Sequence, residues 1–412
     1  MKNLKYLVFV LVSVTLFAFC DYKSNVRENP KLGGWDYDWM VKVKKGIAKN
    51  DQDFLPAYNN LLSTANKALE GDVYSVTYKS LTPIGGTKND YMSMGPYWWP
   101  DPTKADGLPY IRRDGEINPE RDKLDSAQKG KMISAVRSLS LGWFFSEKEE
   151  YAQKAAELIR VWFLNPETLM NPHLKYGQSI PGITEGRFIG IIDGRSFYDL
   201  VDAIALLKMS KVFKPEEETA IKKWFQDYFQ WLTESQFGRD EDNYINNHSV
   251  AYDVQAASIA YFIGDDEYVK RKVEEMPSRR IDPMIEADGR QPHELIRTKA
   301  FGYSVHNLAN FFDTADLGLK VGVDIYHYTN PKGASLKTAL DYLIGFIGKE
   351  KEWPYEQIAG WKGVENSLGL LVRRAAKIYD DESYKKLWED VFYERMKTDW
   401  KILVKNSYDS NL

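Results

Sequence analysis

The sequence predicts an all-α fold in which paired helices form one closed or nearly closed ring, a toroid. Apolar residues recur at helical spacing in twelve segments of the 412-residue chain. Alternating β patterning is scarce, and no strict sequence repeat of the kind that marks open solenoids is present. Because a ring of helical hairpins can use this whole length, we expect a single folded domain.

The expected helices are separated by short turns and by two long irregular segments. The helices span residues 37–49, 53–70, 124–147, 149–164, 191–208, 215–236, 243–263, 266–276, 291–316, 333–348, 358–379 and 382–394. Residues 73–81 are the best strand candidate. The irregular segments are 82–119, with eleven Gly or Pro residues, and 165–190. Long ordered loops in compact domains tend to be functional.

The N-terminus predicts an export signal. Lys2 and Lys5 precede an apolar run over residues 6–19, which is too short to span a bilayer comfortably. The single cysteine, Cys20, fits a lipobox, with lipid on Cys20, or ordinary cleavage before Asp21. Either pattern predicts a periplasmic protein or an outer-membrane-associated lipoprotein. We therefore expect a signal over residues 1–20, a tether over 21–35 and one toroidal domain over 36–412.

Composition excludes several classes of function. There are 55 basic and 59 acidic residues and no strongly basic block, which argues against nucleic acid or anionic lipid as the main partner. The sequence contains no metal-binding His or Cys spacing, G-x-S-x-G elbow, P-loop or dinucleotide fingerprint, so we expect neither a metal nor another cofactor. Aromatic residues make up 14% of the chain, which favours a carbohydrate-binding surface.

Two of the expected helices carry polar side chains that suit a wet cavity. The first begins with the run 246–249, which includes Asn247 and His248. The second has a polar stripe opposite an apolar face, because residues three and four apart share one side of a helix. This stripe consists of Tyr303, His306, Asn307 and Asn310.

Tyr, His, Asn and Arg side chains in one cleft match β-elimination on a uronic acid polymer. This reaction removes the C5 proton and expels the C4 oxygen, so the enzyme must stabilise negative charge at the adjacent carboxylate. Asn247 and Arg297 have suitable side chains for this. We expect Arg297, two turns before Tyr303, to lower the pKa of that tyrosine and favour phenolate.

The stereochemistry of the substrate determines which residue carries out each proton transfer. When the C5 proton and the C4 oxygen lie on the same side of the sugar, Tyr303 serves as both base and acid. When they lie on opposite sides, His248 takes the proton and Tyr303 protonates the leaving oxygen.

Three motifs resemble the alginate lyase superfamily over roughly residues 75–370. They are Asn-Asn-His-Ser at 246–249, Glu-Leu-x-Arg at 294–297 with a tyrosine soon after, and Pro-Tyr-Trp-Trp-Pro-Asp-Pro at 96–102. The resemblance implies an (α/α)-toroid polysaccharide lyase of Bacteroidetes type, which acts on alginate or a related polyuronate such as glucuronan. It also implies that His248 and Tyr303 are the catalytic pair, and that Asn247 and Arg297 neutralise the substrate carboxylate. The sequence departs from the periplasmic alginate lyases in that Ser304, rather than a histidine, follows Tyr303.

Further side chains are expected to contact the anionic polysaccharide. Trp98 and Trp99 would border the groove, or alternatively plug one end of the ring. Arg187 would bind a carboxylate of the substrate, or alternatively form a buried pair with Glu185 or Asp193. The expected substrate-binding residues are Tyr97, Trp98, Trp99, Gln178, Arg187 and His306.

Two other functions remain open at this stage. A uronoside glycoside hydrolase needs two carboxylates that flank the scissile bond, and Asp193, Asp288 and Glu294 are the candidates. A non-catalytic glycan-binding lipoprotein would use the tryptophans for binding and Cys20 as its anchor.

Overall fold

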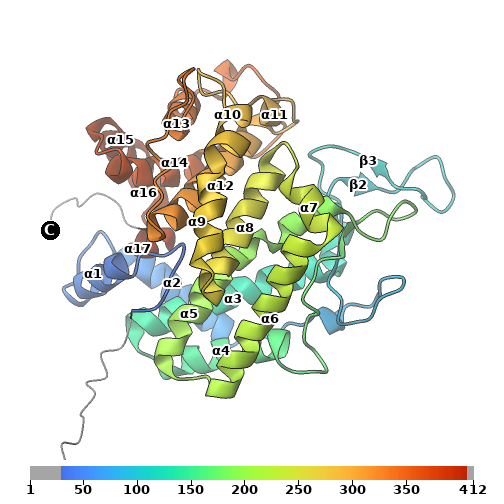
Figure 1. Cartoon of the computed structure of the whole chain (residues 1–412). Helices are drawn as coiled ribbons and strands as arrows, with labels where there is room; N and C mark the ends of the chain where they lie inside the picture. The colour runs from blue at the N-terminus through green and yellow to red at the C-terminus, as the bar shows by residue number, and fades with distance from the viewer. Residues whose placement is uncertain (1–28, 406–412) are drawn as a thin grey trace, which may run out of the picture.

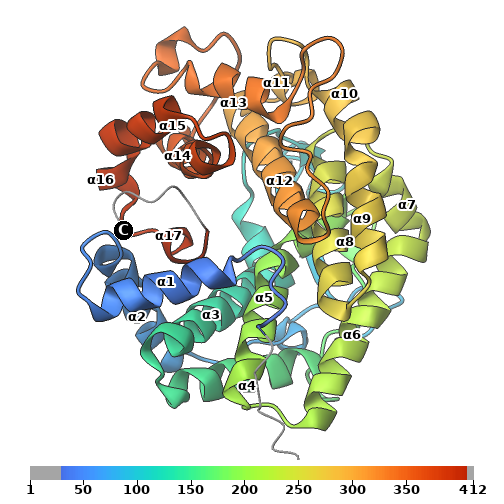
Figure 2. The ribbon, with the colours of Figure 1, turned by 60° about the vertical axis from the view of Figure 1, so that its left-hand side comes forward.

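The computed structural model describes residues 29–405, which fold into a ring of helices (Figures 1 and 2). Five inner helices contact one another in chain order around the ring. They are α3 (Asp125–Ser146), α5 (Phe197–Leu207), α8 (Asn247–Ile263), α12 (Ala300–Lys320) and α14 (Trp361–Ile378). The predicted all-α toroid is therefore confirmed.

Outer helices pack on the inner ones and complete the helical hairpins. They are α2 (Leu55–Leu69) and α4 (Glu149–Phe163) on α3, α6 (Pro215–Glu234) and α9 (Asp266–Glu274) on α8, α13 (Leu336–Ile344) on α12, and α15 (Glu382–Leu387) on α14. Helices α1 (Tyr37–Ala48) and α17 (Lys401–Val404) contact each other between α14 and α3 (Figure 2). The inner α8 is buried on almost every face, as a helix inside two layers must be.

The predicted helix 191–208 begins instead as a 3-10 helix, Phe188–Ser196, which leads into α5. Two glycines account for this difference. The backbone of Gly190 packs directly on the backbone of Gly177, and Gly194 packs against the side chains of Gln255 and Tyr228. A Cβ atom at either position would collide with these neighbours, so the close approach that fixes this segment requires glycine.

The predicted helix 291–316 is interrupted. A short α11 (Pro292–Leu295) is followed by a turn over residues 296–299, and then by α12. The backbone groups that the interruption frees are satisfied by the segment 356–358. The Ala300 N–H donates to the Glu356 carbonyl at 2.9 Å, and the Ile358 N–H donates to the Thr298 carbonyl at 3.0 Å.

Smaller differences concern helix ends and short elements. The predicted helix 215–236 consists of α6 followed by α7 (Gln236–Asp242), and the predicted helix 243–263 begins only at Asn247. The predicted helix 382–394 divides into α15, a π-helical turn Trp388–Phe392 and α16 (Tyr393–Met396). The expected strand over 73–81 is wrong, because this segment forms a 3-10 helix, Val76–Tyr78. The remaining short helices are Pro119–Lys123, Lys208–Ser210, Pro277–Ile281, α10 (Asp282–Met284) and Glu350–Glu352.

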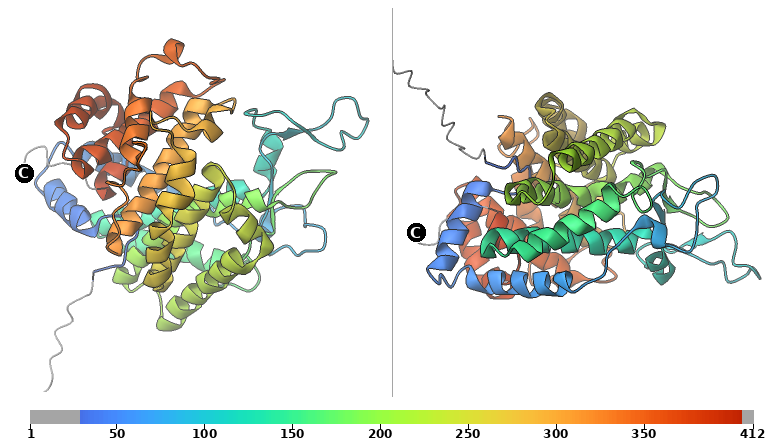
Figure 3. Two further views of the ribbon diagram at one scale, coloured as in Figure 1. Left: turned by 45° about the horizontal axis from the view of Figure 1, so that its top comes forward. Right: turned by 90° about the horizontal axis from the view of Figure 1, so that it is seen from below.

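The two irregular segments lie together on one side of the ring (Figure 3). Strand β1 (Met92–Met94) from the first segment pairs in parallel with β4 (Tyr176–Ser179) from the second. Within the first segment, β2 (Trp98–Trp99) pairs antiparallel with β3 (Ile111–Arg112). Helical periodicity could not reveal these short pairings.

The signal over 1–20, Cys20 and the first part of the expected tether lie outside the described residues. For the last part of the tether, residues 32–35, the prediction is wrong, because these residues are buried. The carboxylate of Asp202 accepts the backbone N–H groups of Gly33, Gly34 and Trp35 at 2.7–2.8 Å. Among residues 29–405, no helix combines the length and apolarity needed to cross a membrane.

Replacement of Asp202 tests whether residues 32–35 belong to the folded domain. Asp202→Ala should lower the free energy of unfolding by about 3 kcal/mol or more, because three buried N–H groups lose their acceptor. Urea unfolding followed by tryptophan fluorescence measures this. Asp227→Asn, at an exposed ion pair with Lys223, should change the free energy by no more than about 1 kcal/mol. Equal stability of Asp202→Ala and the parent protein would contradict the assignment.

Candidate active site

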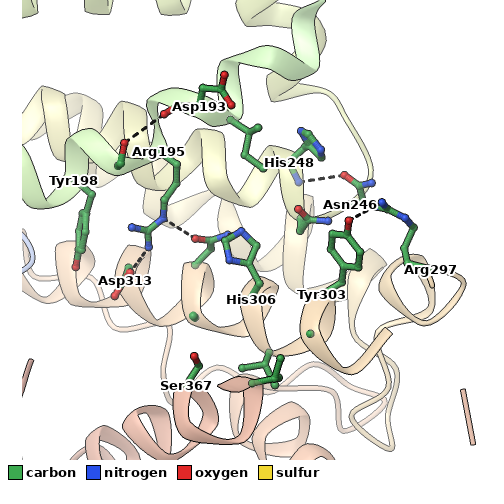
Figure 4. A pocket seen from close by; sticks show the side chains of 18 of the residues that line it. Asp193, Arg195, Tyr198, Asn246, His248, Arg297, Tyr303, His306, Asp313 and Ser367 are labelled. Atoms are coloured by element: carbon green, nitrogen blue, oxygen red, sulfur yellow. Dashed lines mark hydrogen bonds and ion pairs between the residues drawn. The ribbon is translucent and has the colours of Figure 1, made fainter. Parts of the chain in front are cut away.

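A cavity of about 1130 Å³ lies between the inner helices and is bordered by both irregular segments. Figure 4 shows part of its lining, with Tyr303 and His306 from α12 and His248 from α8. The cavity brings together nine of the ten predicted site residues: Tyr97, Trp98, Gln178, Arg187, Asn247, His248, Arg297, Tyr303 and His306.

Basic residues outnumber acidic ones in the cavity lining, although the whole chain is slightly acidic. Nine arginine and lysine residues line it, against three aspartates. The basic residues are Arg112, Arg121, Arg187, Arg195, Arg297, Arg373, Arg374, Lys401 and Lys405, and the acidic ones are Asp193, Asp199 and Asp313. A cleft lined by one sign of charge concentrates ligands of the opposite sign, so the cavity suits a polyanion.

Tyr303 lies at the centre of a hydrogen-bonded group that joins α12 to the irregular segment 82–119. Its hydroxyl accepts a hydrogen bond from Arg297 at 2.7 Å and lies 2.8 Å from the hydroxyl of Tyr97. The Arg297 guanidinium lies 4.0 Å from the centre of the Tyr303 ring and forms two hydrogen bonds with Asp114, at 2.9 and 3.2 Å. The interruption between α11 and α12 allows this contact, because an unbroken helix would direct side chains six residues apart to different faces.

Arg297 lowers the pKa of Tyr303, as the sequence predicted, but the net pKa of this tyrosine is raised. Burial, together with the neighbouring Tyr97, raises the pKa of Tyr303, and Arg297 opposes this increase only in part. Although burial acts the other way, the hydrogen bonds from Arg297, Arg112 and Thr298 hold the pKa of Asp114 well below its usual range. Asp114 is therefore ionised and offsets the charge of Arg297. The raised pKa of Tyr303 disfavours the expected phenolate and favours a protonated hydroxyl.

His248 is held by a buried carboxylate. It lies at the start of α8, where the side chain of the preceding Asn246 caps the helix by accepting the His248 N–H at 3.1 Å. The ring nitrogen Nδ1 of His248 lies 3.0 Å from Glu241 Oε1. Glu241 belongs to α7 and is completely buried.

Asn247 is buried and is held by a different carboxylate. Its backbone N–H and its side-chain amide both donate to Glu294, each at 2.7 Å. Burial raises the pKa of Glu294, whereas these two hydrogen bonds lower it. The amide of Asn247 lies in the cavity lining with a second N–H group still to donate.

Arg187 forms neither of the ion pairs that the sequence left open. Its guanidinium donates to the carbonyl and the side-chain oxygen of Gln178, at 3.0 and 2.9 Å, and lies 5.9 Å from the ring of Trp98. Among the ion pairs of the described residues, none involves Arg187. Its charge therefore faces the cavity without a carboxylate partner.

Trp99 is the one predicted site residue that does not line the cavity. Neighbouring residues in a strand point to opposite faces, so Trp98 faces the cavity and Trp99 faces away. The Trp99 indole donates to the Glu116 carbonyl at 3.0 Å, and the guanidinium of Arg113 lies over its ring. These contacts are with residues that directly follow β3.

The polar stripe on α12 is confirmed in part. Tyr303, His306 and Asn310 line the cavity, but Asn307 is buried away from it and donates to the side chain of Gln291 at 2.9 Å. His306 Nε2 lies 3.3 Å from the Asn310 amide. Desolvation by the surrounding protein, with the positive charge of Arg195, lowers the pKa of His306 to about 4.

Sequence reasoning missed Asp114, Glu241 and Arg195 as parts of the site. Arg195 donates to Asn310 and forms an ion pair with Asp313. Charged residues of these types are common on protein surfaces, and no motif marks them. Only the tertiary contacts show that each one holds a side chain of the cavity.

The carboxylates considered for a hydrolase are already committed to other partners. Asp193 accepts hydrogen bonds from Tyr91 at 3.0 Å and Ser93 at 2.5 Å. Glu294 is buried against Asn247 and does not line the cavity. Asp288 is paired with Arg290 and does not line the cavity either. They do not form the pair of facing carboxyl groups that glycoside hydrolysis requires.

The fold and the cavity define an (α/α)-toroid protein with a site for an acidic polymer, and comparison with known proteins narrows this class. The family model for alginate lyase matches residues 75–353. The crystal structure of an alginate lyase from Bacteroides ovatus has 40% sequence identity and a TM-score of 0.88, and the match covers 91% of this chain and 99% of that one. No curated protein matches the sequence significantly.

Two complexes of alginate lyase A1-III variants with a tetrasaccharide are more distant and share the fold alone. One has a TM-score of 0.52 with 13% identity, covering 84% of this chain and 88% of that one. The other has a TM-score of 0.50 with 14% identity, covering 80% and 89%. The chain belongs to the alginate lyase family and is a polysaccharide lyase.

Proposed function

We propose that this polysaccharide lyase cleaves alginate or a related polyuronate by β-elimination and leaves 4,5-unsaturated uronate ends. The observation that carries this proposal is the hydroxyl of Tyr303, held by Arg297 and Tyr97 in a cavity that His248 and several basic residues also line. The description of the Bacteroides ovatus relative as an alginate lyase supports the choice of polymer.

The substrate carboxylate is the first group that the site must stabilise. Arg297 was expected to do this, but its guanidinium is occupied by Asp114 and Tyr303. Among residues 29–405, Arg187 has no carboxylate partner, and Asn247 has a further N–H group, so these two are the better candidates for binding the substrate carboxylate. Hydrogen bonds and positive charge at this position lower the energy of the dianion that forms when the C5 proton leaves.

The raised pKa of Tyr303 favours different roles for Tyr303 and His248, one as the acid and the other as the base. Tyr303 carries a proton that it can donate to the leaving C4 oxygen. The Nδ1 atom of His248 is engaged by Glu241, which leaves Nε2 as the atom able to accept the C5 proton. If Tyr303 served as both base and acid, it would first have to lose its proton, against the effect of burial. The division therefore suits substrates in which the proton and the leaving oxygen lie on opposite sides.

Removal of the Tyr303 hydroxyl tests the proposed acid. Tyr303→Phe should lower kcat on alginate by at least about 100-fold, because a positioned acid or base contributes about that much or more. Ultraviolet absorbance of the unsaturated product measures the rate, on polymannuronate, polyguluronate and glucuronan. Tyr110→Phe is the matched control, since Tyr110 lies in the irregular segment 82–119 that borders the cavity, but its hydroxyl donates to Glu120 and neither residue lines the cavity. A fully active Tyr303→Phe would refute the mechanism.

The two neighbouring tryptophans provide a second, internally controlled test. Trp98→Ala should raise the KM for alginate by about three- to tenfold, because an aromatic contact contributes about 1 kcal/mol. Trp99→Ala should change it by less than about twofold, since Trp99 lies outside the cavity lining. Steady-state kinetics with folded variants, checked by circular dichroism, measure both values. Equal effects would contradict a sugar-facing role specific to Trp98.

We also propose that the protein is exported and acts in the periplasm or at the outer membrane. The basic start, the apolar run 6–19 and Cys20 support this. Mass spectrometry of the protein recovered from the cell envelope tests it. Lipid on Cys20 at the new N-terminus would identify a lipoprotein, and an N-terminus at Asp21 would identify ordinary cleavage. A mature protein that still begins at Met1 would contradict the proposal.

A further inference from the structure

The environment of the Glu241 side chain is unusual for a carboxylate. The side chain is fully buried, and one of its oxygens, Oε1, lies 3.0 Å from Nδ1 of His248. The other oxygen, Oε2, has no hydrogen-bond partner among residues 29–405. Within that part of the chain the His248 ring is the sole partner of this carboxyl group.

Stability of the fold does not explain this arrangement. A buried carboxylate with an unsatisfied oxygen destabilises a protein. The end of α7 is already anchored by the next residue, Asp242, which forms ion pairs with Lys272 at 2.5 Å and Arg280 at 2.8 Å. The contact between Glu241 and His248 is therefore not needed to hold α7 in place, and its main effect is on the histidine ring.

We propose that Glu241 is a positioning residue that keeps the proton of neutral His248 on Nδ1 and turns Nε2 towards the cavity as the base for the C5 proton. This inference rests on the proposed function. An ionised carboxylate only accepts hydrogen bonds, so the ring nitrogen that contacts it must be the protonated one. The second nitrogen then keeps its lone pair for the substrate.

The proposed step balances its protons and electrons. Nε2 of His248 takes the C5 proton, and the electron pair of the C5–H bond forms the double bond between C4 and C5. The bond between C4 and its oxygen breaks, and Tyr303 donates its hydroxyl proton to that oxygen. The imidazolium forms against the negative charge of Glu241, and its proton returns to Tyr303 through solvent when the product leaves.

The charged groups around Glu241 and His248 are consistent with the proposed positioning role of Glu241. Arg187 and Asp193, from the segment 187–196, face Glu241, and burial raises the pKa of Glu241 while His248 opposes the increase. Glu294 from α11 and His306 from α12 face His248, and the ring of Tyr244 packs on it at 5.9 Å. The imidazolium would thus form close to two carboxylates, Glu241 and Glu294.

The test is Glu241→Gln, which keeps the shape of the side chain and removes its charge. We expect kcat to fall by about 100-fold or more with KM nearly unchanged, as when a histidine base loses its orienting carboxylate. The acidic limb of the kcat/KM profile should move to lower pH by about one unit, because an imidazole without a neighbouring carboxylate protonates at lower pH. Glu241→Asp should recover part of kcat. Asp242→Asn is the matched control, and it should reduce stability without moving the pH profile.

Nuclear magnetic resonance of the ring nitrogens provides a readout that does not depend on activity. The chain has only five histidines, so His248 can be assigned with one variant. We expect the Nδ1–H form in the parent protein and in Glu241→Asp, and loss of this preference in Glu241→Gln. The Nε2–H form in the parent, or unchanged kcat and pH profile in Glu241→Gln, would overturn the inference. A parent protein that forms no unsaturated product on any polyuronate would overturn the proposed function instead, and the tautomer would still decide the role of Glu241.

Discussion

The ion pair between Arg297 and Asp114 connects the two parts of the molecule from which the cavity is built. Arg297 lies in the turn between α11 and α12, and Asp114 lies in the irregular segment 82–119. Through this pair the segment reaches the helical ring beside Tyr303, where it also contributes Tyr97. The same pair neutralises Arg297, so that burial controls the protonation of Tyr303. One interaction therefore shapes the cavity and leaves burial as the main influence on the pKa of its central hydroxyl.

The same arrangement, a carboxylate that orients a polar side chain of the cavity, recurs at other residues of the site. Asp114 holds Arg297, Glu241 holds His248, and Glu294 holds Asn247. Each carboxylate lies behind the side chain that it orients, so the surface that a ligand meets stays cationic. Rigid support of this kind is what a reaction that develops negative charge requires, because donors that are already oriented need no reorganisation. The near-neutral composition of the chain does not reveal this local separation of charge.

The sequence predicted the ring of helices, and nine of the ten site residues that it predicted line the cavity, because helical periodicity and short motifs are local features. It did not predict the interruption before α12, since backbone bonds from residues 356–358 stabilise it. The orientation of Trp98 and Trp99 depended on a two-residue strand pairing that no pattern reveals. Asp114 and Glu241 carry no motif at all. Residues 32–35 were misassigned to a tether because their glycines, which look like linker residues, instead allow close packing around Asp202 and Tyr198.

The central claim is that the cavity performs elimination, with Tyr303 as the acid and His248 as the base. The masses of the products from a uronate tetrasaccharide test this claim most directly. Elimination consumes no water, so we predict that the two fragments together have the mass of the substrate, and that one fragment carries the unsaturated end. Fragments whose combined mass exceeds that of the substrate by one water would show hydrolysis and contradict the account.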